Sequence, residues 1–133
     1  MSDLKSLSKN TIAEAIGLKI TSVEEGEVKG ELPVDHRTHQ PYGLLHGGAS
    51  VVLAETLGSV GSHFMVEKNG KRAVGIEINA NHIRPVRSGA VYGTATLKHK
   101  GGKVHIWSID IKDKLGRLVC ISRLTVMIVP RNE

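Results

Sequence analysis

A single carboxylate stands in an otherwise apolar segment of the sequence, and it is the first candidate for chemistry. Glu55 lies within residues 48–66, where most side chains are small or aliphatic, and no Lys or Arg lies within four positions of it. Carboxylates are rare in apolar surroundings unless they are paired or functional, because burying an ionised group is costly. Glu55 could therefore act as a general base or as a nucleophile. The alternative is a structural carboxylate that pairs with a cation from elsewhere in the chain.

A turn rich in polar residues and glycine lies immediately before this segment. It contains Gln40 and ends in His46, Gly47 and Gly48, so that Gly47 would stand at the entrance of a helix. The free N–H groups of a helix N-terminus can bind an oxyanion, and glycine lets a ligand approach the backbone closely. A base or nucleophile beside such donors is the minimum equipment for acyl transfer. The glycine pair could also serve only a tight turn, and His46 could be a neutral helix cap.

The composition is that of one globular domain over residues 1–133. Hydrophobic residues make up 40% of the chain and charged residues 23%, which is ordinary for a soluble protein. No apolar run approaches the ~20 residues of a membrane helix, and the polar first ten residues lack a signal-peptide pattern. Cys120 is the only cysteine, and His36, His39 and His46 have no Cys or spaced acidic ligands beside them. We therefore expect a cytoplasmic protein without a membrane span, a disulfide or a metal site.

The formal net charge of +5 points to an anionic partner. The cations concentrate at residues 84–87 and 98–103, which could hold a small polyanion such as a nucleotide tail with several phosphates. Two solvated strand ends are the alternative interpretation, since exposed Lys and Arg are common. The chain has one Trp, two Tyr and one Phe, and it contains no basic helix or nucleic-acid motif. We therefore expect no nucleic-acid partner.

The spacing of apolar residues and turns predicts the elements that must position these groups. Residues 4–16 have helical spacing and end at Gly17, whereas residues 48–66 are apolar around the whole circumference, which is typical of a buried helix. Strands are predicted at residues 18–23, 28–33, 73–83, 90–98, 104–112 and 118–129. The simplest arrangement is an α+β fold in which a mostly antiparallel sheet wraps around the long central helix.

Together with this order of elements, several short segments resemble the hot-dog fold family. They are Pro33-Val34-Asp35-His36-Arg37, Gln40 through Gly48, Leu53-Ala54-Glu55-Thr56-Leu57-Gly58-Ser59, Ile78-Asn79-Ala80-Asn81-His82 and Ser122-Arg123-Leu124-Thr125. Within that family, the chain is similar to the 4-hydroxybenzoyl-CoA thioesterase branch, which includes bacterial 1,4-dihydroxy-2-naphthoyl-CoA hydrolases and enterobactin proofreading thioesterases. The resemblance covers residues 17–129 and implies an acyl-CoA thioesterase with the hot-dog fold.

The resemblance also implies a role for each residue of the motif. Glu55 matches the catalytic base or nucleophile of the family, and the N–H of Gly47 matches the donor that faces the thioester oxygen. Gln40 and His46 match residues that contact the thioester region and orient the substrate. Ser59, one turn after Glu55, matches a hydroxyl that positions water or the acyl product, although a Ser can also bond to its own helix.

CoA is part of the substrate in this family, so the resemblance implies no separate cofactor. It places the path of the pantetheine and nucleotide along one glycine and two segments. These are Gly75, then His82, Ile83, Arg84 and Pro85, and finally His99, Lys100, Gly101, Gly102, Lys103 and Val104. The charge pattern agrees independently, since Arg84, Lys100 and Lys103 are cations of the kind that bind phosphate.

Members of the family form dimers that usually pair into homotetramers, and the CoA tail often crosses a subunit interface. We therefore expect a homo-oligomer whose sites lie between subunits. The acyl group implied by the resemblance is aromatic, such as hydroxybenzoyl or 1,4-dihydroxy-2-naphthoyl, the latter belonging to menaquinone biosynthesis. Three other functions stay open: hydrolysis of thioesters on acyl carrier protein, hydration or dehydration of acyl thioesters, and acyl-CoA binding without catalysis.

Overall fold

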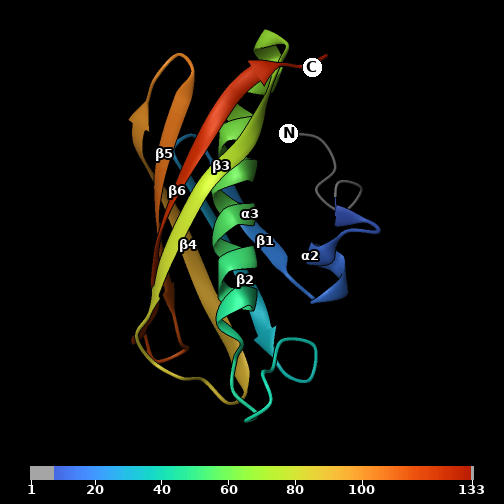
Figure 1. Cartoon of the computed structure of the whole chain (residues 1–133), viewed down its shortest axis with the longest axis vertical. Helices are drawn as coiled ribbons and strands as arrows, with labels where there is room; N and C mark the ends of the chain where they lie inside the picture. Colours follow the sequence, from blue (N-terminus) through green and yellow to red (C-terminus); the bar gives the residue numbers. More distant parts are fainter. Residues whose placement is uncertain (1–7, 133) are drawn as a thin grey trace.

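The structure, a computed structural model, describes residues 8–132 and consists of an antiparallel sheet with helices on one side of it (Figure 1). The elements are α2 (Ile12–Ala15), β1 (Lys19–Glu24), β2 (Glu27–Val34), α3 (Gly47–Val66), the 3-10 helix η1 (Glu67–Asn69), β3 (Lys71–His82), β4 (Gly89–Lys100), β5 (Val104–Lys112) and β6 (Leu118–Pro130). The six strands are ordered β1-β2-β4-β5-β6-β3, and every neighbouring pair is antiparallel. This confirms the predicted α+β arrangement of an antiparallel sheet around a long central helix.

Helix α3 is buried on one face only. The buried residues of α3 are Ser50, Leu53, Ala54, Leu57, Gly58, Gly61, Ser62, Met65 and Val66. On the other face, Val52, Glu55, Ser59 and Val60 are only partly buried. The prediction of burial all round is therefore wrong. The aliphatic residues of this second face line a cavity, which the apolar periodicity of the sequence does not distinguish from a core.

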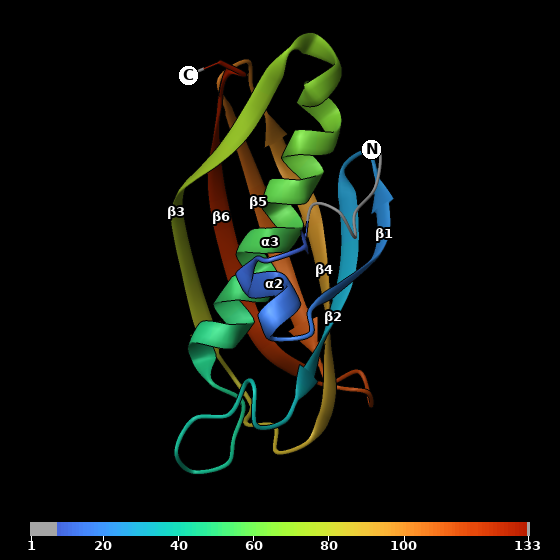
Figure 2. The same cartoon turned by 90° about the vertical axis from the view of Figure 1, so that its right-hand side faces the viewer.

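By length and hydropathy alone, residues 47–69 would qualify as a membrane span, contrary to the expectation from the length of apolar runs. Half of the most apolar window of this segment is buried inside the fold. The core helix of a soluble protein passes the same test, and α3 packs along the sheet as such a helix does (Figure 2).

The predicted helix over residues 4–16 is interrupted within the described residues. Its later part is α2, Ile12–Ala15, and positions 4–7 lie outside the described residues. Asn10 has a φ of 62°, which lies outside the right-handed helical region, so a helix cannot continue through it. After α2, Gly17 adopts a φ of 77° and turns the chain into β1. Figure 2 shows α2 on the face of α3 that is turned away from the sheet.

A polar network around Trp107 lies in the core between α3 and the sheet. The Trp107 ring fits because Gly61 has no side chain, and a Cβ there would collide with the ring. The indole N–H of Trp107 donates to Ser62 Oγ at 2.7 Å, and Ser62 Oγ lies 2.8 Å from His105 Nδ1. Burial is the largest cause of a lowered pKa of His105. The network fixes the sheet-facing side of α3 and hence the direction in which its other side points.

Candidate functional site

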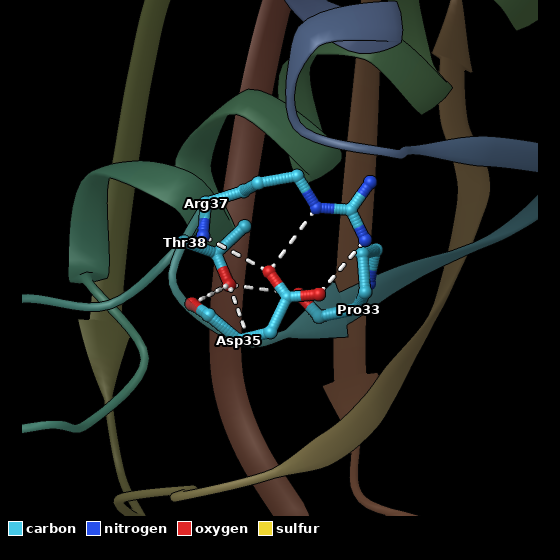
Figure 3. Close-up of polar contacts among 4 residues, drawn as sticks. All are labelled: Pro33, Asp35, Arg37 and Thr38. Carbon is cyan, nitrogen blue, oxygen red and sulfur yellow. Dashed lines mark hydrogen bonds and ion pairs between the residues drawn. The ribbon is translucent and has the colours of Figure 1, made fainter.

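The loop between β2 and α3 begins with a hydrogen-bonded clasp of Asp35 and Arg37 (Figure 3). The Asp35 carboxylate accepts from the Arg37 guanidinium at 2.8 and 3.2 Å and from the Arg37 backbone N–H at 2.9 Å. These hydrogen bonds lower the pKa of Asp35 to about 2. The Thr38 hydroxyl donates to the Pro33 carbonyl at 2.8 Å. The clasp thus fixes the start of the loop that carries Gln40.

Gln40 is oriented by its own loop. Its side-chain Oε1 accepts from the backbone N–H of Tyr42 at 2.5 Å and from that of Leu44 at 3.5 Å. The amino group of the same side chain can only donate hydrogen bonds. Gln40 also lines a cavity of about 320 Å³ together with Gly47 and His82. The Gln40 amide can therefore offer an N–H to a carbonyl oxygen bound in that cavity.

His46 and Gly47 form the beginning of α3. His46 Nδ1 accepts from the Gly48 N–H at 2.8 Å, so His46 is the helix cap, which was the alternative interpretation of this residue. Within residues 8–132, the Gly47 N–H has no hydrogen-bond acceptor. A Cβ on Gly47 would lie 2.6 Å from His82 Nε2, so the His82 ring lies against the backbone there. A free N–H at the positive end of a helix can stabilise a developing oxyanion.

We call the space at the entrance of α3 the Gly47 cavity. It is lined by Gln40, Leu44, Leu45, Gly47, Ser50, His82, Ile83, Arg84, Pro85 and Val119. The segment from His82 to Pro85 is the first of the two segments that the resemblance places along CoA. The structure brings this segment to the predicted oxyanion donor, as a substrate path would require.

Glu55 lies in a different space, which we call the Glu55 cavity. It has a volume of about 510 Å³ and is lined by Ser8, Thr11, Ile12, Ala13, Ile20, Val52, Glu55, Thr56, Ser59 and Val60. A Cβ on Gly75 would lie 2.5 Å from Glu55 Oε2, so the carboxylate rests against the backbone of β3. The pairing of β3 with β6 shifts register between Gly75 and Glu77, beside this contact. Gly75, assigned by resemblance to the CoA path, therefore lies against the predicted catalytic carboxylate.

The alternatives weighed for Glu55 and Ser59 are not observed in the described part of the chain. No Lys or Arg among residues 8–132 forms an ion pair with Glu55. The Ser59 hydroxyl makes no hydrogen bond to its own helix or to any other residue of that range. Both side chains line the Glu55 cavity. The Ser59 hydroxyl is thus available to hold water beside the carboxylate.

The predicted site is divided in two. Glu55 follows Gly47 by eight residues, which at 1.5 Å per residue is about 12 Å along the axis of α3. The Glu55 cavity and the Gly47 cavity share no lining residue. General acid–base catalysis and oxyanion stabilisation both require contacts of about 3 Å to the same reacting group. Within one chain, Glu55 and Gly47 therefore cannot act on one thioester.

The second predicted CoA segment, at the turn between β4 and β5, lies at the opposite end of the sheet from the beginning of α3 (Figure 1). His82 pairs with Cys120 of β6, whereas Val104 pairs with Met127. The seven residue steps from Cys120 to Met127 span about 24 Å of strand. Residues 99–104 form the turn and strand ends at that far end, where Lys100 Nζ lies 3.9 Å from a Glu25 carboxylate oxygen. One chain does not bring the two CoA segments together.

Sequence reasoning missed the contribution of α2 and the residues just before it. Ser8, Thr11 and Ile12 line the Glu55 cavity, but no motif distinguishes them. The position of so short a helix follows from tertiary packing, which local patterns do not encode. Within residues 8–132, no three His, Cys, Asp or Glu side chains gather as a metal site would require. His63 forms an ion pair with Glu67, in which Nε2 of His63 lies 2.7 Å from Oε2 of Glu67.

Known proteins resemble this chain both in sequence and in structure. A sequence model of the thioesterase superfamily matches residues 42–120. The proofreading thioesterase EntH of Klebsiella pneumoniae is 48% identical over 121 residues, which cover 91% of this chain and 88% of that protein. The 1,4-dihydroxy-2-naphthoyl-CoA hydrolase of Escherichia coli is 43% identical over 126 residues, covering 95% and 92% respectively. The structure of thioesterase HI1161 from Haemophilus influenzae superposes with a TM-score of 0.92 at 45% identity and covers 98% of this chain and 90% of that one.

Proposed function

This chain belongs to the thioesterase superfamily, and on that premise we propose that it hydrolyses aromatic acyl-CoA thioesters at a site shared by two subunits. Hydrolysis of thioesters is the activity of its family. An aromatic acyl group is supported by the similarity to a 1,4-dihydroxy-2-naphthoyl-CoA hydrolase, and this substrate would place the chain in menaquinone biosynthesis. The observation that carries the shared site is the separation of Glu55 from Gly47 along α3.

A second copy of the chain can complete the site through β3. This strand is an edge of the sheet, twelve residues long, with Val74 37% exposed and Ile76 50% exposed. The other edge, β1, has six residues and a register shift after Ile20. A long unpaired edge is a template for pairing with another strand. We therefore assign the dimer contact to β3.

Two-fold symmetry makes such a β3 pair antiparallel, so opposite ends of the two strands lie side by side. Glu55 rests against Gly75 in the first half of β3, whereas Gly47 lies against His82, the last residue of that strand. Pairing therefore brings Glu55 of one subunit toward Gly47 of the partner subunit. The same symmetry brings residues 99–104 of the partner to the end of the sheet that carries the segment from His82 to Pro85.

In the proposed reaction, Glu55 accepts a proton from water held beside Ser59, and the resulting hydroxide attacks the thioester carbonyl carbon. The carbonyl oxygen becomes an oxyanion that accepts from the N–H of Gly47 of the partner subunit and from the amide of Gln40 of the partner subunit. Collapse breaks the C–S bond, and the proton passes from Glu55 to the leaving thiolate, giving free acid and CoA. In the second route, a Glu55 carboxylate oxygen attacks the carbonyl carbon, the C–S bond breaks and CoA leaves as the thiolate. Water then hydrolyses the mixed anhydride to the free acid and the Glu55 carboxylate, and its proton passes to the thiolate.

The test is thiol release from a panel of acyl-CoAs, aromatic and aliphatic, by the wild type, Glu55→Ala and the control Glu27→Gln. Glu27 lies on β2, outside both cavities, and has a side chain 45% exposed. Loss of the base should lower kcat roughly 10²- to 10⁴-fold, whereas the control should match the wild type. Benzoyl and naphthoyl esters should exceed acetyl esters in kcat/KM.

Each competing function gives a different result in the same assay. CoA binding without thiol release from any ester would replace hydrolysis with acyl-CoA binding. Release only from carrier-protein thioesters would move the substrate to acyl carrier protein. A hydrated or dehydrated acyl-CoA without free thiol would identify a hydratase or dehydratase.

A further inference from the structure

Residues of α2 line one side of the Glu55 cavity, and residues of α3 and β1 line the other. Val52 and Val60 of α3 and Ile20 of β1 line it from the side of the core, against which all three also pack. The opposite wall comes from α2, where Ile12 lines the cavity and is 60% exposed. Ile12 is therefore a large apolar side chain that the fold places at the cavity without using it in the core.

We propose that Ile12 sets the largest acyl group that the Glu55 cavity accepts, so that α2 determines acyl specificity. This inference rests on the proposed function, because it assumes that the acyl group of the thioester enters the cavity beside Glu55. A cavity of about 510 Å³ lies within the range of small-molecule sites and is large enough for an aromatic acyl group. The volume left for that group depends on how far the side chain at position 12 extends.

The position of Ile12 is fixed from both ends of α2. On the N-terminal side, the Asn10 N–H donates to Glu14 Oε1 at 3.2 Å. On the C-terminal side, Ala13 is buried and its carbonyl accepts from the Leu18 N–H at 3.0 Å. A substitution at position 12 should therefore change the volume of the cavity rather than move its wall.

The same wall is linked to the loop that carries the oxyanion donors. A Cβ on Gly17 would lie 2.6 Å from an Arg37 guanidinium nitrogen and 2.9 Å from Pro33 Cγ. The turn after α2 thus packs on the Asp35–Arg37 clasp, which precedes Gln40 in the chain. The side of the Glu55 cavity formed by α2 is therefore in contact, through the turn after α2, with the start of that loop.

The chemistry of the lining defines the class of acyl group. Glu55 is the one ionisable side chain among the described residues that line the cavity. The remaining side chains are aliphatic or carry hydroxyls, as Thr56 and Ser59 do. An acyl group with its own carboxylate would be repelled by Glu55 and would find no cation in this lining. The cavity is therefore suited to an uncharged, largely apolar acyl group.

The experiment compares Ile12→Phe and Ile12→Ala with the wild type on acetyl-CoA, benzoyl-CoA and 1-naphthoyl-CoA. The control is Leu115→Phe, because Leu115 is 70% exposed in the turn before β6 and does not line the cavity. In Ile12→Phe, kcat/KM for the naphthoyl ester should fall at least about tenfold while that for the acetyl ester stays within about twofold. In Ile12→Ala, the ratio of naphthoyl to benzoyl turnover should rise. The control should leave all three ratios unchanged.

A second measurement tests the wall without turnover. The affinity for 1-naphthamide, an uncharged probe followed by its fluorescence, should weaken in Ile12→Phe and stay unchanged in Leu115→Phe. If the wild type releases no thiol from any thioester but naphthamide binding responds in this way, the proposed reaction fails and the role of Ile12 in the cavity is supported. If Ile12→Phe changes all three thioesters equally, or changes neither turnover nor naphthamide binding, the role of Ile12 is overturned. Matching thermal unfolding curves for the variants establish that the fold is intact.

Discussion

The two cavities lie on the same helix, α3, but differ in their position along it and in the chemistry of their lining residues. The Glu55 cavity lies beside the middle of the helix, is mostly apolar and contains a single ionisable side chain among its described lining residues. The Gly47 cavity lies at the helix entrance and combines a backbone N–H with Gln40, His82 and Arg84. The first is equipped to activate a nucleophile and the second to activate an electrophile. In the proposed function, one chain thus holds both halves of the active site but no complete site.

The largest effect should come from separating the halves genetically. Glu55→Gln and Gln40→Ala each disable one half, and each should lower kcat by about 10²-fold or more. When the two variants are mixed under conditions that exchange subunits, half of the dimers are mixed and each has one intact site of two. Activity should then return to about a quarter of the wild type, as two-fold symmetry requires.

The readout is thiol release before and after exchange, with each variant exchanged against itself as the control. If both groups worked within one chain, no mixed dimer would contain an intact site. Activity that stays at the average of the two variants would therefore contradict the shared site.

A smaller effect should follow when the carboxylate is displaced rather than removed. Gly75→Ala places a Cβ 2.5 Å from the present position of Glu55 Oε2, so the carboxylate must move. A displacement of about 1 Å can cost roughly 10²-fold in kcat, whereas KM should change little because the Gly47 cavity is untouched. Thr96→Val, a nearly isosteric change on β4 outside both cavities, should keep kcat. Steady-state kinetics that show a raised KM with normal kcat for Gly75→Ala would assign Gly75 to CoA binding instead.

A still smaller effect should come from the cations along the predicted CoA path. Arg84→Ala and Lys103→Ala should each raise KM for an acyl-CoA up to about fivefold, because such exposed ion pairs are weak. The increase should shrink as salt is added and be absent with the corresponding acyl-pantetheine. Lys29→Ala on β2 should have no effect. An effect of Arg84 without one of Lys103 would mean that residues 99–104 of the partner lie outside the path.

The smallest effect is expected on stability rather than on catalysis, at His105 in the core between α3 and the sheet. Burial lowers the pKa of His105 below the ordinary value of 6.5. As the pH falls through about 6.5, the unfolded chain binds a proton that the folded chain does not, so the free energy of unfolding decreases. Denaturant titrations at about pH 7.5 and about pH 5.5 should show a smaller loss for His105→Gln than for the wild type. An equal loss in both proteins would show that other groups cause the dependence.

Patterns that are local in the chain were sufficient to predict the elements. Residues 104–112 alternate and end in turns, and they form β5 over that same range. The long helix was predicted to within one residue of α3. The prediction of residues 4–16 extended through Asn10, because apolar spacing does not reveal one residue with positive φ.

The arrangement of the candidate site is harder to predict than the elements. Motif and resemblance predict Gln40, Gly47 and Glu55 as site residues and place the base beside the oxyanion donors, whereas the geometry of α3 separates Glu55 from Gly47 within one chain. The contacts of Gly75 with Glu55 and of Ile12 with the same cavity join segments far apart in sequence. Such contacts arise from packing, and no local period encodes them.

In the proposed dimer, the edge of β3 would also determine how the protein behaves on dilution. A separated subunit would expose the backbone donors and acceptors of a twelve-residue strand beside Val74 and Ile76, which is the form of surface that nucleates aggregation. Dissociation of the proposed dimer would abolish activity and expose that surface at the same time. Specific activity and solubility would therefore both fall as the protein is diluted. A substrate that binds across the interface would then also stabilise the dimer and protect the protein from aggregation.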